Sequence, residues 1–461
     1  MTERSSGGIG PAGDAAILGR LDRIPVWPYR RLTLWVLGAG YVFAFFDIVN
    51  IGSAMPVIAE QFGVSSDYVS WAVTASLVAY IVGAYLDGTI SDIWGRRISL
   101  AISVALFSVG SVGAAFSYSV PALIVWRAVA GLGIGAEIAS VTTYIGEVSP
   151  RAVRGRYTSW ATTCAYAGFA AVPFVARALV PNFDWGWRAL FLIGAIGGVT
   201  ILFMRRGLPE TPRWLIAHGR AEEAEAVVRN AERNARESLG GELPEPQPAR
   251  ERPRPTSRRF PTVAMFQPPY LGRVSLLIAI WFFYYIGNYG WLEMAPTLLK
   301  QRGYTITESL GYLVVTGIGF LVGALLSVAF NDRFERKFTA VAAGLVWVSS
   351  LFVIGFFPTP AVVMAGGFIA STTIGLMVPI MYTLTAEHFG TAARATGVAA
   401  TDGLGHLGGA LAPIAILWAA HAAGFAGGLS LMAVSGLIVV ALLPFCLGTT
   451  GRSLETVAEA A

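Results

Sequence analysis

Residues 125–156 read VWRAVAGLGIGAEIASVTTYIGEVSPRAVRGR, and this stretch decides the fold. As far as Tyr144 it is mostly apolar except for Arg127 and Glu137, and it is long enough to cross a bilayer as a helix. It then runs into a basic loop that begins at Glu147. An ionisable side chain inside a spanning helix is costly, so Arg127 and Glu137 are candidate functional residues.

The whole chain has the composition of a membrane protein. Of its 461 residues, 55% are hydrophobic and 13% are charged, whereas an ordinary soluble domain has about 25% charged residues. Apolar runs recur along the chain, and each predicts a helical span, because lipid cannot satisfy an open backbone. The expected spans lie near 32–57, 69–90, 98–117, 121–146, 156–180, 187–204, 271–297, 307–330, 338–357, 360–385, 395–420 and 424–447. We therefore expect an all-α membrane protein with twelve transmembrane helices.

Basic residues fall mainly on one side of these spans. Arg30 precedes the first span, and Arg96, Arg205 and Arg394 follow even-numbered spans. Because lysine and arginine accumulate in cytoplasmic loops, we expect a multi-pass protein of the cell membrane with both termini in the cytoplasm. The net charge of +5 then follows from topology, and nucleic-acid binding is not expected.

Three matches at one offset indicate an internal duplication. The pairs Asp92 and Asp332, Glu147 and Glu387, and Arg154 and Arg394 are each 240 residues apart. Two parallel six-helix bundles are typical of transporters that rock around a central site. The expected parts are an N-terminal tail (1–31), a first bundle (32–204), a linker (205–270), a second bundle (271–447) and a C-terminal tail (448–461). Within the linker we expect a surface helix from Glu222 to Leu239, followed by a segment rich in Pro and Arg.

The chain resembles the major facilitator superfamily over nearly its whole length. The loop GTISDIWGRR at 88–97 is similar to that superfamily's signature between helices 2 and 3. The segments EVSP at 147–150 and LPETPRWL at 208–215 resemble the sugar-porter pattern, although no QQLS-like segment opens the seventh span. The segment GAE at 135–137 and the aromatic seventh span are more similar to niacin- and aromatic-acid-type symporters and to organic-ion transporters. This resemblance implies the twelve-helix fold and small organic ions or metabolites as substrates.

Asp47 and Arg127 form the first candidate pair. Taking a rise of about 1.5 Å per residue, Asp47 lies roughly 15 Å below the outer end of its helix and Arg127 roughly 9 Å below the outer end of its own, so the two side chains can meet. We interpret Asp47 as the group that accepts and releases a coupled proton, with Arg127 controlling how tightly it is held. A permanent ion pair between the two helices is the alternative.

Glu137 is a third candidate in the same bundle. It lies at mid-depth or nearer the inner side, where burial favours a neutral carboxyl. It is interpreted as a second proton site or a substrate contact, and a hydrogen-bonded core residue is the alternative. Neither Asp47, Arg127 nor Glu137 recurs 240 residues later, whereas a purely architectural residue should recur.

Asp402 and His406 are four residues apart and share a helix face. The resembled organic-ion transporters place a residue whose charge sign follows that of the substrate near His406. Histidine can change charge near neutral pH, so it can meet a carboxylate or exchange a proton. An internally hydrogen-bonded Asp–His pair is the alternative.

Aromatic side chains with polar tips suit a pocket that stacks a flat ligand and hydrogen-bonds its edge. Candidates for such a pocket are Tyr166, Tyr284, Tyr285, Asn288, Tyr289 and Trp291. Lipid-facing or interfacial packing is the alternative for each aromatic residue.

A second set of charges is expected to control opening on the inner side. These residues are Asp92, Arg96, Glu147, Arg154, Glu387 and Arg394, which we expect to form an ion-pair network that breaks when the bundles rock. Glu293 and Arg177 lie nearer the outer ends and are expected at an external gate or a solvated rim.

The expected function is secondary active transport by alternating access. The interpretation we favour is proton-coupled uptake of a small organic acid, aromatic or heterocyclic. A sugar or polyol symporter and an exporter of organic cations or drugs are the alternatives. No nucleotide loop, metal cluster or nucleophile–base arrangement is present in the sequence, so no enzyme, cofactor or metal is expected. The expected partners are a small-molecule substrate, a coupled proton and the bilayer, with the chain acting as a monomer.

Overall fold

A computed structural model describes residues 11–150, 153–245, 265–268, 270–330, 333–389 and 394–448. Within these ranges the chain is helical and contains no strand. By length and hydropathy, 11 of the described helices could cross a membrane. The last of them continues for 50 residues, with non-helical angles at Ala423 and Gly424, so it comprises two passes and accounts for the expected twelve.

The first bundle contains six long helices. They are α2 (Arg31–Phe62), α3 (Ser66–Trp94), α4 (Arg96–Ala115), α5 (Val120–Val148), α6 (Arg154–Leu179) and α7 (Gly186–Met204). The glycines of the stretch at 125–156 bring α5 against α3, because a methyl group at Gly131 or Gly135 would overlap the carbonyl oxygen of Ser76 or Tyr80. This close approach fixes the position of Arg127 and Glu137 in the bundle.

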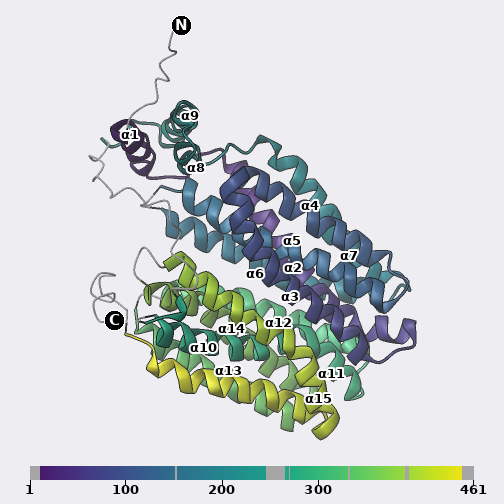
Figure 1. Cartoon of the computed structure of the whole chain (residues 1–461). Coiled ribbons are helices and arrows are strands. Elements are labelled where there is room, and N and C mark those ends of the chain that lie inside the picture. Colours follow the sequence, from purple (N-terminus) through teal and green to yellow (C-terminus); the bar gives the residue numbers. More distant parts are fainter. Residues whose placement is uncertain are drawn as a thin grey trace.

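The second bundle repeats this arrangement. It contains α12 (Ile306–Phe330), α13 (Arg336–Phe356), α14 (Pro360–Glu387) and α15 (Arg394–Leu442). Its first span is composite: α10 (Leu271–Tyr289) passes through a π-helical turn, η3 (Gly290–Met294), into α11 (Ala295–Gln301). The two bundles lie side by side, in purple to blue and in green to yellow (Figure 1).

Three shorter helices gather at one end of the first bundle, which we call the basic end (Figure 1). They are α1 (Pro11–Asp22), α8 (Pro212–Ala217) and α9 (Ala221–Leu239). Arg20 of α1 donates to Glu225 and to Glu232 of α9, both at 2.6 Å, and Arg23 donates to Glu232 at 2.5 Å. α9 agrees with the expected surface helix, whereas the segment after Glu245 lies largely outside the described residues.

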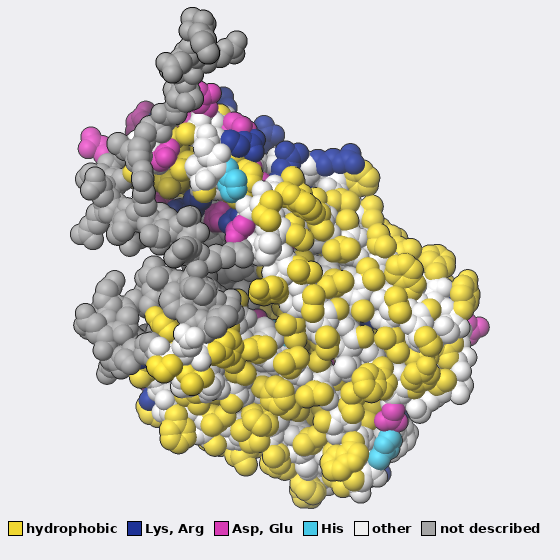
Figure 2. All heavy atoms as spheres, in the orientation of Figure 1, with side chains coloured by type: hydrophobic (Ala, Val, Ile, Leu, Met, Phe, Trp, Pro, Cys, Tyr) yellow, Lys and Arg dark blue, Asp and Glu magenta, His cyan; other side chains and the backbone are white. Residues whose placement is uncertain are grey.

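Hydrophobic side chains cover the visible face of both bundles, and charged ones collect near the basic end (Figure 2). This distribution is the one a helical protein needs when its flanks face lipid.

The two bundles contact each other from mid-depth to the end opposite the basic end. α3 packs on α15, α6 on α12, and α2 on η3 and α11. Near that opposite end, the Lys300 ammonium lies 2.5 Å from the Glu60 carboxylate, and the Thr74 hydroxyl donates to the Ala410 carbonyl at 2.7 Å. The seam is therefore closed on this side.

Candidate functional site

Asp47 and Arg127 meet inside the first bundle, and both side chains are fully buried. Arg127 Nη1 donates to Asp47 Oδ2 at 2.8 Å, and Nη2 donates to the Asp47 backbone carbonyl at 2.9 Å. Asn50 Nδ2 donates to the other carboxylate oxygen at 2.9 Å. The pair joins α2 to α5, so protonation of Asp47 would weaken a contact between two helices of one bundle.

Glu137 is also buried, but it has a cationic partner that we did not expect. Arg205, just after α7, donates from Nη1 to Glu137 Oε2 at 2.7 Å and from Nη2 to Oε1 at 2.5 Å. The Ser103 hydroxyl donates to Oε2 at 2.7 Å. The sequence pattern placed Arg205 in a cytoplasmic loop, whereas its side chain is 3% exposed. The expectation of a neutral carboxyl at Glu137 is therefore replaced by a bidentate ion pair.

Asp402 and His406 lie at the seam, among tyrosines of both bundles. Asp402 Oδ1 accepts hydrogen bonds from the Tyr285 hydroxyl at 2.6 Å and from the Tyr382 hydroxyl at 2.8 Å. The His406 Nδ1 atom lies 2.9 Å from the Asp402 backbone carbonyl oxygen and 3.7 Å from its Oδ1. The carboxylate is thus held by two phenols of the second bundle.

The imidazole ring of His406 lies between two phenol rings. Its centroid is 3.9 Å from that of Tyr285 and 4.5 Å from that of Tyr80, with interplanar angles of 36° and 25°. Tyr80 belongs to α3 of the first bundle, whereas Tyr285 and His406 belong to the second. This arrangement, which we call the tyrosine sandwich, would open if α3 moved away from α15.

The other predicted aromatic candidates are buried as well. Tyr289 is 6.0 Å from His406 between ring centroids, and the Tyr166 ring stacks 6.1 Å from Phe320 across the seam. Trp291 donates to the Ser371 hydroxyl inside the second bundle at 3.0 Å, so it belongs to the packing of that bundle.

Two polar side chains in the same region lack partners. Among the described residues, the Tyr284 hydroxyl and the Asn288 Oδ1 are buried without a hydrogen-bond partner. Such atoms are uncommon in a packed interior, and they fit a surface that meets water or a ligand in another state.

The gating candidates form ion pairs within each bundle. Arg96 donates to Glu147 at 2.7 Å and to Asp92 at 3.0 Å in the first bundle. In the second bundle Arg336 donates to Glu387 at 2.9 Å. The side chains of Arg154 and Arg394, at the first positions of α6 and α15, lie outside the described residues, as does Asp332.

The segment at 208–215 makes hydrogen bonds to this network. The sequence alone did not predict these contacts. Glu210 accepts from the backbone N–H groups of Arg96 and Arg97, both at 3.1 Å, and so caps α4. The Thr211 hydroxyl donates to Glu147 at 2.5 Å. A carboxylate at a helix N-terminus is favourable, so the segment holds α4 to the end of α5.

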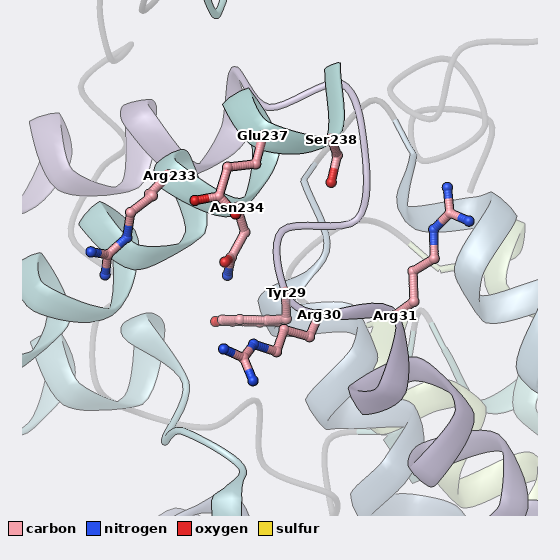
Figure 3. A pocket seen from close by; sticks show the side chains of 7 residues that line it. All are labelled: Tyr29, Arg30, Arg31, Arg233, Asn234, Glu237 and Ser238. Carbon is pink, nitrogen blue, oxygen red and sulfur yellow. The ribbon is translucent and has the colours of Figure 1, made fainter. Parts of the chain in front are cut away.

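A cavity of about 470 Å³ lies at the basic end, away from the sandwich. Its lining residues come from the start of α2 and from α9, as Figure 3 shows. They are Tyr29, Arg30, Arg31, Arg233, Asn234, Glu237 and Ser238. In the part of the chain that the structure describes, no group of three His, Cys, Asp or Glu side chains could hold a metal ion.

Comparison with known proteins gives a consistent result. The model of the family described as Major Facilitator Superfamily matches residues 37–413. The chain is 30% identical to the putative metabolite transport protein YyaJ of Bacillus subtilis. The alignment spans 402 residues and covers 86% of each protein. It is 26% identical to the niacin transporter NiaP of Acinetobacter baylyi, over 96% of this chain and 99% of that one.

Two further likenesses extend this result. The chain is 27% identical to the 4-hydroxybenzoate transporter PcaK of Acinetobacter baylyi, over 78% of this chain and 79% of that one. Its fold is similar to that of an inward-open structure of the xylose transporter XylE from E. coli, with a TM-score of 0.74, 20% identity, and coverage of 94% and 99% of the two chains.

Proposed function

The chain belongs to the Major Facilitator Superfamily, and on that premise we propose that it takes up a small aromatic or heterocyclic organic acid together with protons. Its relatives are transporters and not enzymes, and it is an integral membrane transporter with many spans. The substrate class, the direction of transport and the coupling ion are the parts that we propose.

The tyrosine sandwich is the observation that carries the substrate class. The imidazole of His406 occupies the space between Tyr80 and Tyr285 that a flat ring would take. If the bundles separate, Tyr80 moves away from His406 with α3, and a flat ligand can enter the gap and stack on Tyr80 while its carboxylate meets His406. Relatives named for niacin and for 4-hydroxybenzoate support such a ligand, because each of those molecules is a flat ring that carries a carboxyl group.

The Asp47–Arg127 pair supports coupling to protons. A neutral Asp47 would leave Arg127 with the backbone carbonyl and without its anionic partner at 2.8 Å. Binding and release of one proton would therefore change how α2 and α5 are joined, which is what coupling requires. Glu137 is a weaker candidate than its sequence position indicated, because both of its carboxylate oxygens are already paired with Arg205.

We place the basic end in the cytoplasm of a cell-membrane protein, because Arg30, Arg31 and the charged helices α1 and α9 lie there. The closed side of the seam is then the outer side, and the gating pairs lie on the inner side. The chain is proposed to act as a monomer, since each bundle supplies part of the sandwich.

Uptake into proteoliposomes tests this proposal. With the exterior acidic, labelled nicotinate and 4-hydroxybenzoate should accumulate above the level of protein-free liposomes, and a protonophore should abolish the excess. Asp47→Asn should lose this uphill accumulation while it retains exchange. Accumulation that equals that of protein-free liposomes for both acids would refute the proposal.

A matched pair of variants at Tyr80 tests the proposed stacking of the substrate. Tyr80→Leu removes the ring, and we expect the apparent KM to rise roughly 2- to 12-fold, the value of one aromatic pair. Tyr80→Phe keeps the ring and should stay near wild type. Equal effects of the two variants would exclude stacking on Tyr80.

Sugars are the alternative substrates with independent support. Relatives include the arabinose–proton symporter of Escherichia coli, which is 32% identical over 217 residues, or 46% of this chain. Labelled arabinose, D-xylose and myo-inositol therefore belong in the same assay. Uphill accumulation of a sugar without that of either acid would favour a sugar symporter.

A further inference from the structure

Glu293 differs from the other carboxylates in the spans that the structure describes. Asp47, Asp87, Glu137 and Asp402 all accept hydrogen bonds from side chains. Glu293 is 1% exposed, and neither Oε1 nor Oε2 accepts a hydrogen bond from a side chain among the described residues; the backbone of Gly52 is the polar group that lies against the carboxyl group. We expected this residue at an external gate or a solvated rim, and its burial excludes the solvated rim.

The backbone around Glu293 is unusual as well. It lies in η3, the π-helical turn that interrupts the first span of the second bundle. Such turns are rare and occur often at functional sites. One helical turn further on, the Thr297 hydroxyl is also buried without a partner.

Glu293 faces the other bundle at the closed part of the seam. A methyl group on Gly52 of α2 would lie 2.5 Å from Glu293 Oε2 and 2.6 Å from its Cα. The carboxyl group is therefore packed against the backbone of α2, five residues beyond Asp47 along that helix.

Few charged groups face this carboxyl group. They are Asp47 from α2 and Arg127 from α5, and Tyr289 faces it from α10. α11 and α15 direct no charged side chain at it among the described residues. Arg127 is paired with Asp47, so it attracts the Glu293 carboxylate from a distance without forming an ion pair with it.

We propose that Glu293 binds a proton when the outer half of the seam closes and returns it to the exterior when the seam opens. An ionised carboxylate without an ion-pair or side-chain partner is costly to bury, whereas a neutral carboxylic acid is tolerated. Opening exposes Glu293 to external water, where ionisation costs little. The closed seam therefore holds the proton more tightly than the open one, and external acid favours closure.

This external proton lock is separate from coupling at Asp47. Its proton enters and leaves on the same side, so it makes closure depend on external pH without adding to the protons carried. The inference takes one thing from the proposed function, namely that the protein alternates between a state with the outer half of the seam open and a state with it closed. A test that reads opening directly can therefore succeed even if neither acid is a substrate.

Spin labels across the outer mouth measure the opening. We would replace Cys164 and Cys446 by Ala and label Asp184→Cys in the first bundle and Arg302→Cys in the second, in lipid nanodiscs. The distance distribution would be recorded from pH 5 to pH 9. The short, closed distance should predominate at pH 5, and its ratio to the long distance should fall at least tenfold by pH 9.

Two variants of Glu293 then decide the assignment. Glu293→Gln, which is neutral at every pH, should remain closed throughout, and Glu293→Asp should keep a pH dependence. Two matched controls, Glu60→Gln and His421→Gln, remove exposed titratable groups that pair across the same mouth. In both variants the distance ratio should depend on pH as it does in wild type.

Two results would overturn the proposal. One is a wild type whose distances do not change with pH. The other is a Glu293→Gln variant in which the change of the distance ratio between pH 5 and pH 9 is within twofold of that in wild type. In proteoliposomes the wild type should show a protonophore-sensitive excess over protein-free liposomes if the proposed function holds, and Glu293→Gln should show less of it, because its outer side stays closed. Loss of that excess in wild type, with the pH-dependent gate intact, would refute the transport proposal alone.

Discussion

Replacing Gly52 by alanine should hold the outer half of the seam open. The added methyl group would lie 2.5, 2.6 and 2.7 Å from the Oε2, Cα and carbonyl oxygen of Glu293. Two of these three atoms are backbone, so the clash is not relieved by turning the Glu293 side chain. The two bundles would have to separate at this point instead.

The magnitude follows from the cost of overpacking. Forcing one extra carbon into a packed interior costs about 1–3 kcal/mol. The open state does not bear this cost, because the two helices are apart there. The ratio of open to closed protein should therefore rise roughly 5- to 150-fold.

Alkylation from outside measures this ratio. Thr74→Cys, in a background without Cys164 and Cys446, places a thiol on the seam where the native hydroxyl contacts Ala410. A membrane-impermeant maleimide should label it faster by the same factor in Gly52→Ala. Gly272→Ala is the matched control, because nothing lies within 4 Å of the added methyl group. Equal labelling rates in the Gly52→Ala and Gly272→Ala proteins would show that the contact does not hold the seam shut.

Three further predictions concern the charges. Glu137→Gln removes the anionic partner of the buried Arg205 and should lower the free energy of unfolding by about 3–5 kcal/mol; a melting temperature within 1 °C or so of wild type would contradict this. Burial alone would raise the pKa of Glu232, but hydrogen bonds from Arg20 of α1 and from Arg23 just after it outweigh this effect and hold that pKa below its ordinary value. The docking of α1 on α9 should therefore be stable at pH 6 and weaken as the pH falls below about 4.5, which hydrogen exchange of α1 would show as faster exchange after correction for intrinsic rates. Asp92→Asn should lower the transport rate more than substrate affinity, and an unchanged rate measured in the uptake assay would exclude a role in gating.

Hydropathy and spacing were sufficient for the architecture. The number of passes, the surface helix in the linker and the meeting of Asp47 with Arg127 all follow from helix periodicity and rise per residue. These features depend on local pattern and on neighbours within one bundle, and the repeat at a constant offset predicts the two bundles.

The pattern was insufficient where partners come from distant segments. Arg205 was counted as a loop residue, since charge distribution does not reveal that its side chain turns back into the bundle. Tyr80 was not identified, because one tyrosine in an apolar span has no signature until α15 is placed beside α3. The burial of Glu293 depends on a π-helical turn and on Gly52 in the other bundle, and neither is evident from its own neighbours.

The contact between α1 and α9 has a consequence for how the protein is made. Arg20 leaves the ribosome more than 200 residues before Glu232, so α1 is synthesised before its partner α9, and six spans are inserted in between. The N-terminal half is thus completed by the linker and not by its sixth span. A half-molecule intended to fold alone should end after Leu243, which is buried against the helices of the basic end, and not at Met204.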